Sequence, residues 1–439
     1  MNKDKYQLKK MRFAAKFLLV ASLSTLIGCQ RNAAPPPTVN LPKTLRDVPA
    51  LRLNFRFESD VPAPTINQPS QSEERNPAVQ ADFDVNRPQE QLDRILTSPD
   101  KLRILAVYHR TGDLPSEFRL DMYSPEGKLL RKISYEGMAV HFAETIVWSP
   151  DSSAAAFVAM IRANQTSAIP PPPPENQPNS ESNANSAANA NAAATDANVN
   201  LTVSPTPAPD APKAVLTFRT EQLYIANRDG ADVKPLTQNE GLIYFYFVWS
   251  PDSSALAAMA ATFQEWNYLQ YDAEKKGEHF NPQGRPRLIE KTGRERRLDD
   301  NLTSVRPVWS PDSAKVAVAF DKQTRIYDAV GDAPTQAAIP LRNQLLISSK
   351  AFDENLQRQE QSAGNTNAAT NTLPETAILP DENSLVSFNP IISLEWTEDS
   401  LLYLQTGYLK QMKNESDSAR SYLRWHRLVF SPQAVALGN

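Results

Sequence analysis

Glycine and histidine are both scarce in this chain. The 13 glycines among 439 residues never lie two, four or five positions apart. The sequence therefore has no dinucleotide-binding fingerprint, no Gly-x-Ser-x-Gly nucleophile elbow and no phosphate-binding P-loop. The four histidines are widely spaced, which excludes a zinc motif on a single helix; they are His109, His141, His279 and His426. We predict no metal site, no cofactor and no catalytic residue, and an enzyme is the less favoured hypothesis.

Cysteine occurs once, as Cys29, so no disulfide can form within the chain. Six basic side chains and then an apolar run at 17–27 precede it. Eleven residues are too few to span a bilayer, and a basic flank before a short apolar run is typical of a secretory signal peptide. The segment Leu26-Ile27-Gly28-Cys29 resembles the lipobox of bacterial lipoproteins. The resemblance implies cleavage before Cys29 and acylation of this residue with palmitate-type chains.

This resemblance predicts an exported protein that is lipid-anchored to the bacterial cell envelope. Gln30 follows the cysteine where an Asp would retain a lipoprotein at the inner membrane, so the family's sorting rule implies the outer membrane of a two-membrane organism. The membrane would then be one partner, through the anchor. A plain signal peptide or a buried apolar segment is the alternative. Met11 is an alternative start.

Charge of positive sign is not in excess. The formal net charge is −4, and it becomes more negative once the basic N-terminal segment is removed. Nucleic-acid-binding domains carry a basic patch or stripe because they neutralise phosphates. We therefore expect no nucleic-acid partner, and a protein or peptide partner instead.

The tetrapeptide Trp-Ser-Pro-Asp occurs three times, beginning at Trp148, Trp249 and Trp309. Ser, Pro and Asp at the first three positions suit a type I turn, since Pro presets φ and Asp bonds its own backbone. Apolar, strand-like residues lie on both sides of each copy. The motif therefore predicts repeated strand–turn–strand units in which these residues are structural: Trp148, Pro150, Asp151, Trp249, Pro251, Asp252, Trp309, Pro311, Asp312 and, in a degenerate copy, Trp396.

Two degenerate copies, at 96–100 and 394–400, bring the number of units to five. Second hairpins are indicated at 118–133 and 222–237, with turns that contain Glu-Gly and Asp-Gly. The spacing of the units is near-regular once two low-complexity insertions are removed. Two hairpins in each unit of about fifty residues predict an all-β protein, a β-propeller of five or six four-stranded antiparallel blades.

The segments 223–230, 236–237 and 248–252 resemble the propeller repeat (WD40-like) of TolB-type proteins, which also occurs in some prolyl peptidases. The resemblance covers about five units from residue 90 onward, and it implies the propeller fold and a role in envelope-associated complexes. This chain departs from the family pattern by having Ser152, Ser253 and Ser313 where glycine is common after the Asp. We expect serine to be tolerated there, because a type I turn only prefers glycine.

The predicted organisation has three parts. Residues 1–28 are the signal peptide, and 29–90 form a Pro/Asn/Gln-rich tether with one strand near 51–58. Residues 91–439 form the propeller, with low-complexity insertions at about 164–213 and 353–388. The strand near 51–58 alternates apolar and polar residues, and we expect it to pair with the strand at 422–430 and so close the last blade.

One segment is a candidate for partner contact. Trp266, Tyr268 and Tyr271 gather in a short stretch before the basic residue Arg296, and Trp, Tyr and Arg dominate interface energetics. The favoured alternative is that Trp266 continues a blade strand and that the arginines form ion pairs. The acidic pairs 299–300 and 398–399 are interpreted as solvated turns.

Two functions remain open from the sequence. The favoured one is a lipid-anchored envelope propeller that serves as a platform for a protein or peptide partner. The alternative is a propeller enzyme, a glycan lyase or hydrolase, with its site on the central channel face. Convergent titratable groups on that face would favour the enzyme.

Overall fold

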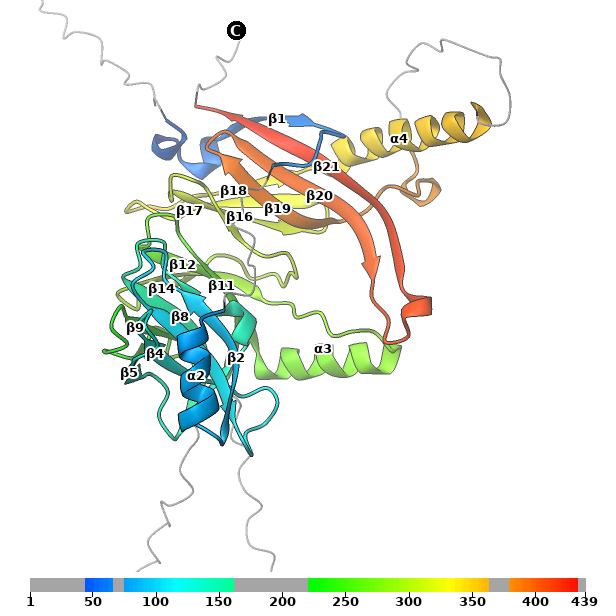
Figure 1. The fold of residues 1–439 in the computed structure, drawn as a ribbon. Coiled ribbons are helices and arrows are strands. Elements are labelled where there is room, and N and C mark those ends of the chain that lie inside the picture. The colour runs from blue at the N-terminus through cyan, green and yellow to red at the C-terminus, as the bar shows by residue number, and fades with distance from the viewer. Residues whose placement is uncertain (1–43, 66–74, 162–219, 363–378, 433–439) are drawn as a thin grey trace, which may run out of the picture. The chain divides into compact units, whose positions relative to one another are not determined.

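The computed structural model describes residues 44–65, 75–161, 220–362 and 379–432 (Figure 1). Cys29, the signal peptide and the insertion at 164–213 lie outside these residues. The described chain forms one compact unit from Leu45 onward.

Five antiparallel sheets account for the strands of this unit (Figure 1). The first sheet contains β2 (Glu90–Thr97), β3 (Ile104–Arg110), β4 (Arg119–Tyr123) and β5 (Leu129–Lys132). The second contains β6 (Met138–His141), β7 (Val147–Trp148), β8 (Ala154–Ile161), β9 (Gln222–Asn227) and β10 (Lys234–Pro235). The third contains β11 (Leu242–Trp249), β12 (Ala255–Thr262), β13 (Arg285–Glu290) and β14 (Glu295–Arg297).

The last two sheets follow the same plan. The fourth contains β15 (Val308–Trp309), β16 (Lys315–Phe320), β17 (Gln323–Asp328) and β18 (Gln336–Pro340). The fifth contains β19 (Ile391–Glu398), β20 (Leu401–Lys410), β21 (Ala419–Ser431) and, from the other end of the chain, β1 (Asn54–Glu58). Its strand order is β1-β21-β20-β19.

Few helices interrupt the sheets. The α-helices are α2 (Pro77–Asn86), α3 (Phe263–Lys276) and α4 (Arg342–Ser362). Short 3₁₀ helices are η1 (Leu45–Asp47), η2 (Ala50–Arg52), η3 (Ala143–Thr145), η4 (Glu382–Ser384) and η5 (Glu415–Asp417). The described part of the chain is therefore mostly β, as expected, and contains the five units that the repeat predicted.

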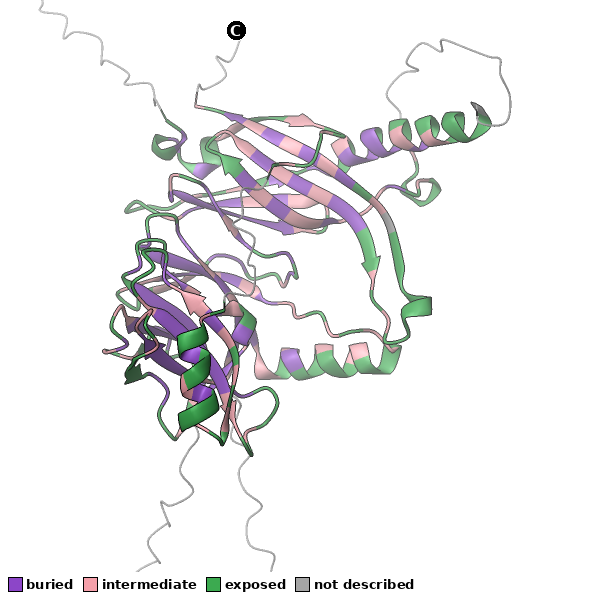
Figure 2. Cartoon of the chain, in the orientation of Figure 1, coloured by how far each residue is buried: buried purple, intermediate pink, exposed green. Residues whose placement is uncertain are grey.

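Consecutive sheets pack face to face through the tryptophans of the repeat. Trp148 lies in a cluster that joins the first and second sheets, and Trp249 in one that joins the second and third. Trp309 and Trp396 occupy the same place at the next two junctions. The other face of the first sheet is covered by α2. Packing of four-stranded sheets in chain order is propeller-like, and the buried residues in Figure 2 follow these junctions.

Serine hydroxyls also link consecutive sheets at their turns. Ser152, Ser253 and Ser313 have φ values of 60°, 62° and 60°, in the left-handed region. Each hydroxyl accepts a hydrogen bond from the amide of an Asp in the preceding unit: Asp100 to Ser152 at 3.0 Å, Asp151 to Ser253 at 3.0 Å, and Asp252 to Ser313 at 2.9 Å. The serine hydroxyl therefore has a structural role at these positions that the turn type alone did not indicate. It links two units, and glycine could not.

The indole N–H groups reinforce the same junctions. Trp148 donates to the carbonyl of Leu96 at 3.0 Å, and Trp309 donates to that of Val248 at 3.1 Å. Both acceptors lie two residues before the turn serine of the preceding unit. The copies that begin at Trp148 and Trp309 therefore supply the turn, the apolar contact and two hydrogen bonds between units, whereas the buried Trp249 Nε1 has no hydrogen-bond partner among the described residues.

The N-terminal segment fastens the last two sheets together. β1 pairs with β21 in a register that runs from Asn54↔Ser431 to Glu58↔Arg427. Just before β1, the amide of Ala50 donates to the carboxylate of Asp328 on β17. The strand expected near 51–58 thus exists, begins three residues later, and pairs with the expected neighbour.

Two boundaries differ from the sequence-based expectation. The supposed tether contains α2, which begins with Asn76 as its cap and Pro77 at its first turn, and which buries Val79 and Phe83. The sequence pattern did not indicate this helix, because only two of its apolar residues, four positions apart, contact the sheet. The second insertion begins within α4, where Asp353 is buried and accepts a hydrogen bond from the amide of Val386.

The strand β11 is apolar on both faces because both are covered. Tyr244 and Phe247 pack in the cluster shared with the second sheet. Ile243 and Phe245 pack with Trp266 of α3.

Replacement of Ser253 tests the link between turns. Ser253→Ala keeps the left-handed backbone and removes the acceptor of the Asp151 amide, so we expect a loss of about 1–2 kcal/mol of unfolding free energy. Ser253→Gly removes the same bond but relieves the backbone, so the net change should be small.

Lys101 occupies the equivalent position (φ 59°) and has no such hydroxyl. Lys101→Gly should therefore stabilise the protein; equal stabilisation by both glycine variants in urea unfolding would show that the hydroxyl contributes nothing.

His426 should make stability depend on pH. The ring is fully buried, stacks on Phe57 at 5.5 Å and is hydrogen-bonded to the Thr406 hydroxyl at 3.0 Å. Burial lowers the pKa of His426 to about 4, so the unfolded chain, with a His pKa near 6.5, binds this proton first as pH falls. The contribution of His426 to the unfolding free energy is therefore constant above about pH 6.5. It falls as the pH decreases from that value to about 4, by up to roughly 3 kcal/mol. Urea unfolding of His426→Gln should show a shallower decline than the parent over this range, and parallel curves would contradict the assignment.

Candidate functional site

Three side chains from the third, fourth and fifth units act on one another: Arg306 lies over the ring of Tyr246, and the charge of Glu395 reaches Tyr246. Tyr246 lies on β11, Arg306 precedes β15, and Glu395 lies on β19. The guanidinium carbon of Arg306 is 4.7 Å from the centre of the Tyr246 ring. We name these three residues the central triad.

The central triad contains titratable groups that are not fully engaged in contacts within the fold. Partial burial raises the pKa of Glu395, and among the described residues its carboxylate has no ion-pair or hydrogen-bond partner. Burial also raises the pKa of Tyr246; Arg306 opposes this shift, while the charge of Glu395 adds to it. A carboxyl group with a raised pKa whose charge reaches a tyrosine can hold or move a proton, and the arginine on that tyrosine ring can bind an anionic ligand.

No local sequence pattern marks the central triad. Its members are separated by sixty and by eighty-nine positions in the sequence, and each lies in an ordinary strand or loop context. They meet only because consecutive sheets place their first strands side by side. This group of titratable side chains would favour the enzyme hypothesis, and reasoning from the sequence missed it.

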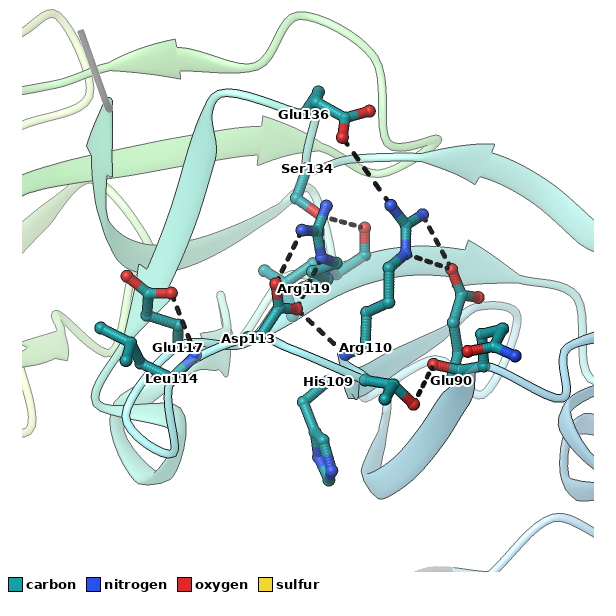
Figure 3. A network of polar contacts seen from close by, with 12 residues as sticks. Glu90, His109, Arg110, Asp113, Leu114, Glu117, Arg119, Ser134 and Glu136 are labelled. Carbon is teal, nitrogen blue, oxygen red and sulfur yellow. Dashed lines mark hydrogen bonds and ion pairs between the residues drawn. The ribbon is translucent and has the colours of Figure 1, made fainter. Parts of the chain in front are cut away.

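A denser polar network lies at one end of the first sheet (Figure 3). Glu90 accepts from Arg87 and from Arg110, and Arg110 also approaches Glu136 at 3.9 Å. Arg119 makes a two-bond contact with Asp113 at 2.8 and 2.9 Å. These ionic groups are paired with one another, which is typical of a structural network.

The buried part of this network centres on Arg87. Its guanidinium donates to Asp121 at 2.7 Å and to the hydroxyl of Tyr123 at 2.6 Å, and it lies over the rings of Phe83 and Tyr108. Burial raises the pKa of Asp121, while Arg87 opposes the shift. Removal of Arg87 would leave a buried carboxylate without a counter-charge, so this residue holds α2 to the sheet.

Beside the network lies a pocket of about 610 Å³. One wall comes from the end of α2 and the segment after it, a second from the end of β3, and a third from β5. Most of the residues that line it are polar or charged. Leu129 and Lys132 of β5 stand at its edge.

The helix α3 presents two tyrosines to solvent. Thr262 and Glu265 form a capping box at its start, and Gly277, at φ 68°, ends it. Trp266 is buried against Phe280 at 4.8 Å between ring centres. The helix is therefore rigidly placed, with one face in the core and another exposed.

Tyr268 and Tyr271 lie three residues apart on the outer face of α3, and each is 67% exposed. We call this surface the tyrosine face. Arg285 of β13 fixes the start of the helix through two hydrogen bonds of 2.7 Å to Glu265. Exposed aromatic side chains on a preorganised helix bind partners with little loss of conformational entropy.

The hairpin of β20 and β21 extends to the other end of α3. The amide of His279 donates to the carbonyl of Gln411 at 2.9 Å, and that of Lys413 to the carbonyl of Gly277 at 2.8 Å. Tyr408 of this hairpin is 43% exposed. The end of the helix is thus supported by the fifth sheet.

The four residues expected to contact a partner do not lie on one surface of the structure. Tyr268 and Tyr271 share an exposed face, whereas Trp266 is core. Arg296 lies on β14 and donates to the carbonyl of Asp328, and among the described contacts none joins it to the tyrosines. The idea that Trp266 continues a strand is wrong, because the capping box begins a helix directly after β12.

The acidic pairs behave differently from each other. Glu398 and Asp399 are exposed at a turn, as expected. Asp299 is buried and bonded to Arg325 and Tyr327, so the interpretation of 299–300 as a solvated turn is wrong for this residue. The tryptophans of the repeat are core residues, as predicted.

Within residues 44–65, 75–161, 220–362 and 379–432, no three His, Cys, Asp or Glu side chains are grouped so that they could hold a metal ion. No helix in the same ranges is long and apolar enough to cross a membrane.

Comparison with known proteins gives weak likenesses. No family model matches the sequence, and no curated protein matches it. Among solved structures, an oligogalacturonate lyase in complex with manganese is 10% identical, with a TM-score of 0.32, over 77% of this chain and 65% of the lyase, which is less than two thirds of its length. A putative TolB from Agrobacterium tumefaciens is 10% identical, with a TM-score of 0.26, over 57% of this chain and 69% of that one.

A third likeness is to prolyl oligopeptidase B from Galerina marginata, at 8% identity and a TM-score of 0.36, over 78% of this chain and 36% of that one. TM-scores of this size do not assign a function. The class of this protein therefore rests on its own sheets: the described residues form a mostly β, propeller-like unit of five antiparallel sheets.

Proposed function

We propose that this protein is an exported, lipid-anchored envelope protein whose propeller-like unit binds a protein or peptide partner. The observation that carries the binding role is the tyrosine face, where Tyr268 and Tyr271 stand on a helix fixed at both ends. The lipobox-like segment ending at Cys29 supports the anchor. The resemblance of the repeat to TolB-type proteins supports a place in envelope complexes.

The tyrosine face fits the chemistry of an interaction site. Tyrosine offers a large apolar ring and a hydroxyl, and it has few rotamers to lose on binding. The faces of the sheets are mostly occupied by one another or by α2, whereas Tyr268 and Tyr271 on this helix are largely exposed. A partner that covers both rings would bury apolar surface that is exposed to solvent in the free protein.

Photo-crosslinking from the helix tests this role. A photoreactive residue at Asn267, on the same exposed side of α3, should yield a discrete adduct in cells, and the membrane fraction should contain it only while Cys29 is present. Adding Tyr268→Ser and Tyr271→Ser should reduce the adduct by about tenfold or more, since the rings supply the contact.

Tyr135, which is 53% exposed outside α3, provides the matched control. Tyr135→Ser should leave the adduct unchanged. An adduct that survives loss of both tyrosines would exclude the tyrosine face. A soluble protein unaffected by Cys29→Ala would exclude the anchor and leave the binding role standing.

The central triad favours a second candidate, an enzyme that cleaves a glycan. Glu395 would act as general acid or base, Arg306 would bind an anionic group of the substrate, and Tyr246 would position or share the proton. These roles follow from the raised pKa of Glu395 and from the contact between Arg306 and Tyr246.

Activity on soluble polysaccharides separates the two candidates. If the protein cleaves one, with new reducing ends or unsaturated products, Glu395→Gln should lower kcat by roughly 10²–10⁴. Glu398→Gln, an exposed carboxylate on the same strand, is the control and should not change it. Cleavage that Glu395→Gln leaves intact would remove the central triad from consideration.

A further inference from the structure

The strand β5 differs from the outer strands of the other sheets. It pairs with β4 on one side only, and all four of its residues are exposed. The outer strands β10 and β18 contain Pro235 and Pro340, which cannot donate to an added strand. β5 has no proline, so its free edge can accept another strand.

The backbone of β5 is aligned for such pairing. The amide of Ile133, just after the strand, donates to the carbonyl of Leu120 on β4 at 2.9 Å. Because N–H groups alternate along an antiparallel strand, the amide of Lys132 points away from β4. The edge therefore presents a donor to any chain that lies alongside.

The side chains of this edge are basic, and the only opposite charge that faces one of them among the described residues is Asp121, across from Lys132 on β4. Lys128, Arg131 and Lys132 have no ion-pair partner among the described residues, and Glu126 in the preceding turn offsets only one of them. By contrast, the edge strand β14 carries Glu295, which pairs with Arg287 at 2.5 Å. Three positive charges oppose pairing between two copies of β5, and they favour an acidic strand.

The pocket beside β5 is suited to a side chain of such a partner. Leu129 and Lys132 line it together with Arg110, Thr111 and Gln89. Its acidic residues already have partners: Glu90 is bonded to two arginines, and Asp82 accepts hydrogen bonds from Tyr123 and Asn86. The groups left to bind a ligand are therefore mainly donors and cations, which fit a carboxylate.

We propose that β5 and the adjacent pocket bind an acidic segment of a partner protein in extended form. The segment adds a fifth strand to the first sheet, and one of its carboxylates enters the pocket between Lys132 and Arg110. Backbone pairing provides the affinity and the pocket provides the selectivity, as in other cases of strand addition. This surface is separate from the tyrosine face and does not depend on it.

The probe is a fluorescein-labelled hexapeptide, Glu-Val-Glu-Leu-Glu-Val, titrated with the chain carrying Cys29→Ala. We expect a rise in anisotropy that weakens as salt increases, no binding of the lysine counterpart, and no binding of a version with proline at the second and fifth positions. Lys128→Glu with Lys132→Glu should weaken binding by about tenfold or more.

Arg294→Glu makes the same kind of charge change at a side chain that is 78% exposed, on the turn between β13 and β14, and should alter affinity less than about twofold. Hydrogen exchange should show slower exchange at 129–132 with peptide bound. Absence of binding, equal binding of the proline peptide, or binding without protection of β5 would each overturn the proposal. Tyr268→Ser with Tyr271→Ser should leave this binding intact, so the two surfaces can fail separately.

Discussion

The bond between a serine hydroxyl of one unit and a turn amide of the unit before it sets how the sheets of this protein stack. Ser152, Ser253 and Ser313 each adopt a left-handed backbone to make it. An L-residue in that conformation costs about 1–2 kcal/mol, and the hydrogen bond to the neighbouring turn offsets much of the cost. Because the turns are fixed to one another, the tryptophans beside them fall into the junctions between sheets, where the core forms.

Regions outside this repeated contact carry the groups that remain available to a ligand. The polar network around Arg87 and Glu90 is internally paired and holds α2 in place. Glu395, the tyrosine face and the cations of β5 have no such internal partners among the described residues. The stable stack supports these groups rigidly, which is the condition under which exposed side chains bind with little entropic cost.

Sequence reasoning succeeded where a signal was local and repeated. The Trp-Ser-Pro-Asp turns, the hairpin at 222–237 and the strand that became β1 all lie within a few residues of the pattern that marked them. It failed where a helix rested on few contacts. α2 buries two side chains and α3 buries mainly Trp266, so neither shows a strong helical periodicity. α4 extends into the 353–388 insertion, where Asp353 is bonded to the amide of Val386 but stands among polar residues in the sequence.

By itself the sequence indicated five repeated units, with five or six blades left open, the turn at each and the tryptophans of the core, because the motif that marks each unit is local and repeated. It also showed that no familiar catalytic motif is present. Only the tertiary structure decided that Trp266 is buried while Tyr268 and Tyr271 are exposed, since this depends on which face of α3 meets β11. It alone brought Tyr246, Arg306 and Glu395 together, because side chains from three units meet only when their sheets are stacked.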